Sequence, residues 1–87
     1  MVMETHEIEP LRKQLDELDE KLVDLLNQRA NLSLTISVLK QDQDLPRYDS
    51  QREEKIFEHI QDVSSGPLIG KPLRDIYETI LRVMKEL

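Results

Sequence analysis

Cysteine and tryptophan are missing from this chain of 87 residues, and glycine (2) and the aromatic residues (1 phenylalanine, 2 tyrosines) are rare. Without cysteine no disulfide can brace the fold, and 2 histidines are too few to build a zinc site. A chain of this length forms one small domain with a limited core. We therefore expect its stability to come from helix packing or from oligomerisation, and we expect no metal.

Basic residues are the minority among the charges: 12 Lys and Arg stand against 18 Asp and Glu, for a formal net charge of −6. Nucleic acids and anionic membrane surfaces select basic patches, so we expect neither as a partner. No apolar run approaches the roughly 20 residues of a membrane span, and the N-terminus lacks the pattern of a signal peptide. These absences predict a soluble, cytoplasmic protein in which a few cations act locally.

What remains is a strongly helical pattern. Neither glycine nor proline occurs between residues 11 and 45, which predicts one long helix from about residue 9 to about residue 41. After Pro46, either Asp49 or Ser50 caps a second helix, which ends at the Ser-Ser-Gly-Pro turn of residues 64–67. Pro72 fits the first turn of a third helix. The expected apolar faces are Ile56, Ile60 and Val63 on the second helix and Leu73, Ile76, Tyr77, Ile80, Met84 and Leu87 on the third.

The long helix carries an apolar seam that a single cation interrupts. Arg29 occupies the slot between Leu25 and Leu32, with Lys40 eleven residues further along the helix. A guanidinium so placed needs an anion, and no carboxylate lies on the seam, so a bound anionic ligand is one candidate. An arginine that extends to the surface and pairs with a glutamate is the other. The seam, spaced by alternating steps of four and three, consists of Leu11, Leu15, Leu18, Leu22, Leu25, Leu32, Ile36 and Leu39.

The unequal helix lengths predict an all-α intertwined homodimer of three-helix protomers, with residues 1–87 as a single domain. The two shorter helices each cover about half of the long one, so a single chain leaves part of its seam in water, whereas two chains that exchange long helices bury it. Arg12 and Arg29 lie about 25 Å apart along one helix, too far for both to bind one small molecule. If Arg12 reaches the ligand of Arg29, it must come from the other chain.

The residues that carry these features also resemble a known family. The fragments Leu11-Arg12, Leu25-Leu26-Asn27-Gln28-Arg29, Lys40 and Pro46-Arg47-Tyr48-Asp49-Ser50-Gln51-Arg52-Glu53 are similar to the all-helical chorismate mutases of the shikimate pathway, over nearly the whole chain. The resemblance implies an intertwined dimer of three-helix protomers that converts chorismate to prephenate. Such a reaction needs no cofactor, metal or nucleophile, because positioning and electrostatic stabilisation suffice.

The resemblance also implies a role for each matching residue. Arg29, with Arg12 of the partner chain, would bind the two carboxylates of chorismate, and Lys40 would donate to the ether oxygen. Arg52 would strengthen the anionic site, while Glu53 and the backbone of Asp49 would hold the ring hydroxyl. The helical pattern agrees for Arg52 and Glu53, which extend the apolar face of the second helix by one turn and should point inward.

Simpler roles remain open for the same residues. Arg52 could pair with an acidic neighbour, Glu53 could complete a capping box with Ser50, and Lys40 could favour the helix dipole. For Asp49 the role of helix cap is the favoured one. We expect Phe57, Tyr48 and Tyr77 to be packing residues.

The chain departs from the family near residue 84. Met84 stands where members carry a serine. Four residues after that serine, members carry a glutamine or glutamate that donates to the ether oxygen, and the sequence ends at Leu87, one residue before this position. We therefore expect reduced catalytic efficiency. Two other functions remain open: a non-enzymatic helical dimerisation module in which Arg29 sets the register, and an isochorismate pyruvate lyase. The sequence also leaves open whether a partner enzyme of the shikimate pathway completes the site, and whether aromatic amino acids regulate it.

Overall fold

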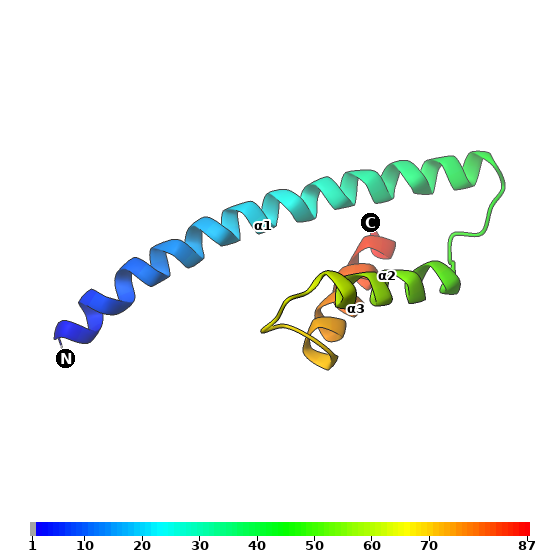
Figure 1. Cartoon of the computed structure of the whole chain (residues 1–87). Helices are drawn as coiled ribbons and strands as arrows, with labels where there is room; N and C mark the ends of the chain where they lie inside the picture. The colour runs from blue at the N-terminus through cyan, green and yellow to red at the C-terminus, as the bar shows by residue number, and fades with distance from the viewer. Residues whose placement is uncertain (1) are drawn as a thin grey trace. The chain divides into compact units, whose positions relative to one another are not determined.

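The structure, a computed structural model, describes residues 2–87, with side chains from residue 6 onward. Every regular element in this range is an α-helix: α1 (Val2–Asp42), α2 (Ser50–Val63) and α3 (Lys71–Glu86) (Figure 1). The prediction of an all-α protomer with one long and two shorter helices is confirmed. The chain divides between Leu32 and Ser33 into an N-terminal unit and a C-terminal unit, each described by itself below.

The described helices include none that is long and apolar enough to cross a membrane. The cytoplasmic location stays a prediction.

Helix α1 begins earlier than expected, at Val2 instead of near residue 9, and it contains Pro10. Proline cannot donate a hydrogen bond to the carbonyl one turn before it, so α1 continues through Pro10 with one backbone hydrogen bond fewer. The sequence predicted that the helix starts near residue 9. That prediction was wrong. The acidic residues before Pro10 continue the helix, and an acidic segment is stabilised near a helix N-terminus by the helix dipole.

In the N-terminal unit the leucine seam is exposed. Its members there are between 53% and 66% exposed in the single chain: Leu11, Leu15, Leu18, Leu22, Leu25 and Leu32. Polar side chains of this stretch make local contacts along the helix, such as the ion pair of Arg12 with Glu9 at 3.0 Å and the hydrogen bond from Gln28 to Asp24 at 2.7 Å. A leucine side chain gains about 1.5–3 kcal/mol when it is fully buried, so this helix leaves much apolar surface that the single chain does not use.

The C-terminal unit has a small core between α2 and α3. Phe57 and Ile60 of α2 and Leu81 of α3 are buried, and three partly buried residues pack against them: Ile56, Leu73 and Tyr77. The core positions of α3 are thus spaced by four residues, as expected when one helix packs its ridge of every fourth side chain against a neighbour.

The predicted apolar faces were only partly right. Ile56, Ile60, Leu73 and Tyr77 do contribute to the core, and Phe57 and Tyr77 are packing residues as expected. Val63 is 67% exposed, and Ile76 and Leu87 are also exposed, whereas Leu81 was missed. The reason is that α3 contacts α2 along the line of residues 73, 77 and 81, so the stripe that begins at Ile76 lies to one side of it.

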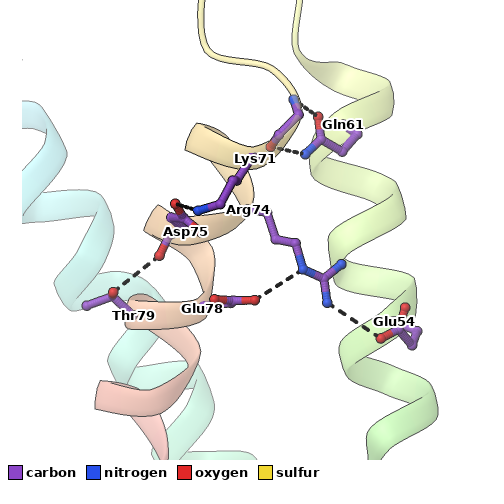
Figure 2. A network of polar contacts seen from close by, with 8 residues as sticks. Glu54, Gln61, Lys71, Arg74, Asp75, Glu78 and Thr79 are labelled. Carbon is purple, nitrogen blue, oxygen red and sulfur yellow. Dashed lines mark hydrogen bonds and ion pairs between the residues drawn. The ribbon is translucent and has the colours of Figure 1, made fainter.

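A side-chain amide joins the end of α2 to the start of α3. Gln61 accepts a hydrogen bond from the backbone N–H of Gly70 at 2.7 Å and donates to the carbonyl of the same residue at 2.8 Å (Figure 2). Gly70 has φ 62° and ψ −137°, a conformation that is essentially restricted to glycine. The pair fixes the N-terminus of α3 against α2.

Arg74 makes a second connection between these helices. Its guanidinium lies 4.0 Å from the centre of the Phe57 ring and forms ion pairs with Glu78 of its own helix (3.1 Å) and Glu54 of α2 (3.8 Å) (Figure 2). Next to it on α3, Asp75 accepts a hydrogen bond from Lys71 and raises the pKa of that ammonium above its usual value. Exposed ion pairs contribute little to stability, so the Arg74 contact with the ring is the more important one for packing.

Candidate active site

The first turn of α2 is organised by Asp49. This residue has extended backbone geometry (φ −136°, ψ 97°), and its carboxylate accepts a hydrogen bond from the backbone N–H of Arg52 at 3.1 Å. Asp49 therefore caps the helix, as the sequence favoured, while Ser50 is already the first helical residue. The Asp49 carbonyl accepts from the N–H of Glu53 at 3.2 Å, and a carbonyl oxygen has a second lone pair for another donor.

Glu53 points toward α3. Its side chain is 21% exposed, and Oε2 forms an ion pair with Lys85 Nζ. The inward orientation expected from the helical pattern thus holds for Glu53. The alternative, a capping box with Ser50, is wrong because Asp49 takes the capping position and the Glu53 carboxylate is engaged with α3.

Lys85 and two residues that contact it, Arg47 and Tyr48, were not assigned to the site from the sequence. The Lys85 ammonium lies 4.5 Å from the centre of the Tyr48 ring, and Arg47 Nη2 donates to the Lys85 carbonyl at 3.1 Å. Tyr48 is 60% exposed in the single chain, so the expectation that it is a packing residue does not hold there. The signals for this cluster were weak: Arg47 and Tyr48 directly precede the Asp49 cap, and Lys85 is a basic residue in the last turn of α3.

Lys40 joins the same cluster from the last turn of α1. It is partly buried, and its Nζ donates to the carbonyl of Arg47 at 3.5 Å. Its position at the helix end also suits the helix dipole, so the simpler role and the functional one are both compatible with the geometry. The C-terminal unit thus connects Lys40 to Glu53 through Arg47 and Lys85.

Arg52 differs from its neighbour Glu53. It is exposed, so the expected inward orientation is not seen in the single chain. Among the residues with described side chains it forms no ion pair, so the alternative of pairing with an acidic neighbour is not seen either.

The remaining two cations lie in the N-terminal unit. Arg29 is partly buried and has an interaction partner, whereas Arg12 is exposed and pairs with Glu9. Their approach to the residues of the C-terminal unit stays a prediction.

A shallow depression of about 420 Å³ lies on the exposed side of α2. Its lining includes three carboxylates and one ammonium group, so its charge does not suit an anionic ligand. The lining residues are Tyr48, Ser50, Gln51, Glu53, Glu54, Lys55 and Glu58. The cluster of Lys40, Arg47 and Lys85 is the better candidate for anion binding, because it gathers cations instead.

Comparison with known proteins finds relatives that cover most of this chain. Residues 11–87 match the family described as chorismate mutase type II. A curated relative from Aquifex aeolicus, a bifunctional chorismate mutase/prephenate dehydratase, is 37% identical over 79 residues that cover 86% of this chain. The chain spans only 22% of the length of that relative, and 23% of a second one from Stutzerimonas stutzeri with the same description.

Solved structures agree with the sequence match. A chorismate mutase from Thermus thermophilus is similar with a TM-score of 0.90 and 28% identity, covering 93% of this chain and 92% of that one. The chorismate mutase from Helicobacter pylori, solved in complex with prephenate, is similar with a TM-score of 0.84 and 30% identity, covering 91% and 86%. With a family match over residues 11–87, this chain belongs to the type II chorismate mutases.

Proposed function

We propose that this chain converts chorismate to prephenate by a Claisen rearrangement. The observation that carries the proposal is the connection of Lys40 to Glu53 through Arg47 and Lys85 within the C-terminal unit. Family membership supports it, as does the similarity to a chorismate mutase that was solved with prephenate bound. Formation of prephenate would place the chain in the pathway to phenylalanine and tyrosine.

For this reaction the protein must hold the substrate in a reactive conformation and supply positive charge near the ether oxygen. Chorismate is a dianion, and its enolpyruvyl arm must fold over the ring before the new C–C bond can form. The breaking C–O bond leaves negative charge on the ether oxygen, which a fixed cation stabilises more in the transition state than in the ground state. Lys40 is the residue to which we assign this donation, since it is partly buried and its Nζ faces the Arg47 backbone at the edge of the cluster.

The other residues hold the substrate in place. Arg29 binds a carboxylate, Arg52 adds positive charge near the anionic substrate, and Glu53 with the Asp49 carbonyl accepts from the ring hydroxyl. The Asp49 carboxylate caps α2, so its backbone is the part left for this role. Glu53 is held by Lys85 through one oxygen, which leaves the other as an acceptor.

We further propose a homodimer in which Arg12 of one chain completes the site of the other. The exposed leucine seam of α1 supports this, because monomeric proteins rarely leave so long an apolar stripe in water. Arg12 is exposed in the single chain and its ion pair with Glu9 is a surface contact, so it can turn to a ligand at little cost.

The test is to add the purified chain to chorismate, follow the loss of chorismate absorbance and identify the product. We expect prephenate without pyruvate. A parallel reaction with isochorismate distinguishes the alternatives: release of pyruvate would indicate a lyase, and no turnover or binding of either compound would indicate a dimerisation module. Either result would overturn the proposal.

A further inference from the structure

Lys85 is the most connected residue of the cluster, and nothing in the family resemblance gives it a role. Its ammonium pairs with Glu53 of α2 and lies over the Tyr48 ring at 4.5 Å. Its carbonyl, one of the last in α3 and so without a partner within the helix, accepts from Arg47 at 3.1 Å. Side chain and backbone are thus fixed by separate contacts.

This ion pair differs from the others of α3. Lys71 pairs with Asp75 and Arg82 with Glu86, each along the helix surface and with both side chains more than half exposed. Lys85 instead reaches from α3 to α2, as Arg74 also does, but its partner Glu53 is only 21% exposed, whereas Glu54, the partner of Arg74, is 66% exposed. Electrostatic interactions gain strength as water is excluded, so this pair fixes its carboxylate more firmly than a surface pair does.

The charge of Glu53 creates a need for such a partner. A carboxylate beside a dianionic substrate repels it, and an unpaired carboxylate at this partly buried position would also be free to rotate away from the ring hydroxyl. The Lys85 ammonium balances the negative charge of Glu53. It also holds Oε2 of Glu53 in place, so that Oε1 can accept a hydrogen bond.

We propose that Lys85 is a positioning residue of the mutase site, which acts by neutralising and orienting Glu53 for the ring hydroxyl of chorismate. The inference rests on the proposed function. It assigns Lys85 to substrate binding through Glu53 and leaves the donation to the ether oxygen with Lys40.

The experiment compares the kinetics of wild type, Lys85→Met and Lys85→Arg with those of Lys71→Met, a control that removes the same charge from the other end of α3. Met keeps the length of the side chain, and the bond from Arg47 to the backbone carbonyl does not depend on the residue type. We expect Lys85→Met to raise KM about tenfold with kcat changed less than about threefold, the size of one charge-assisted hydrogen bond. Lys85→Arg should restore most of the loss, and Lys71→Met should resemble wild type.

A cycle with Glu53→Gln tests that Lys85 acts through Glu53. In that background there is no charge to balance, so Lys85→Met should change KM less than about twofold. Equal effects in both backgrounds, or a wild-type KM for Lys85→Met, would overturn the inference while the mutase activity stands. A wild-type chain that does not turn over chorismate would overturn the proposed function and this inference with it.

Discussion

The two units of the chain differ in how far their apolar side chains are buried in the single chain. The C-terminal unit buries Phe57, Ile60 and Leu81 between α2 and α3. Two hydrogen bonds between the Gln61 side chain and the backbone of Gly70 also join these helices. The N-terminal unit buries none of its seam leucines. This contrast suggests a division of tasks in which the first 32 residues mainly assemble the protein and the later residues supply most of the chemistry.

The largest effect should come from breaking the seam. Leu18→Asp with Leu25→Asp puts two charges where we expect a second chain to pack, and each loss of a buried leucine costs about 2–5 kcal/mol. We expect the variant to lose both dimer and helix content, measured by sedimentation and circular dichroism. Asn27→Asp with Asn31→Asp adds the same charge to the face of α1 opposite the seam and should keep both. A seam variant that stays dimeric would contradict the assignment.

Lys40→Met should show the opposite pattern, with loss of activity and an intact dimer. Removal of one donor to a developing oxyanion typically lowers turnover by about 10²–10³, and we expect the upper end because the sequence offers no second donor at Met84. Lys13→Met, the same change earlier in α1, is the control and should retain full activity. Turnover of the Lys40 variant within a few-fold of wild type would reject the role of this lysine.

Mixing variants tests whether each site draws on both chains. Inactive Arg12→Ala and Lys40→Ala dimers, once exchanged, should form mixed dimers with one intact site and recover about a quarter of wild-type activity. Arg29→Ala mixed with Lys40→Ala is the control, since both residues should serve the site of their own chain. In that mixed dimer one site lacks Arg29 and the other lacks Lys40, so no activity should return. Exchange without recovered activity in the first mixture would show that sites are not shared.

The smallest effect concerns the link between α2 and α3. Gln61→Ala removes both hydrogen bonds to Gly70 and should lower the free energy of unfolding by about 1–2 kcal/mol, seen as a lower Tm at equal protein concentration. Gln51→Ala, at an exposed position of the same helix, is the control. An unchanged Tm for Gln61→Ala would mean that the core alone sets the geometry of the two helices.

The helices could be predicted from the sequence because their signals are local. A seam without glycine or proline indicates α1, and Asp49 and Pro72 are suited to helix starts wherever the chain goes next. The predicted start of α1 near residue 9 was wrong, because the helix continues through Pro10 back to Val2.

The cluster around Lys85 could not be predicted in the same way. Its contacts depend on the path of residues 43–49 and on which residues of α3 meet α2. Of the latter, Leu73 and Tyr77 were predicted and Leu81 was missed. Glu53 was named through the family resemblance, and its inward orientation could be predicted because it lies one turn before Ile56 on a regular helix. Its partner Lys85 comes from another helix, and the apolar pattern did not indicate that contact.

The central claim, that the exposed seam of the N-terminal unit is completed by a second copy of the chain, is tested most directly by unfolding at several protein concentrations. If folding and assembly are coupled, the midpoint of thermal unfolding must rise with protein concentration, and sedimentation must show twice the 10.3 kDa mass of one chain. A folded monomer at micromolar concentration, with a midpoint independent of concentration, would contradict the account.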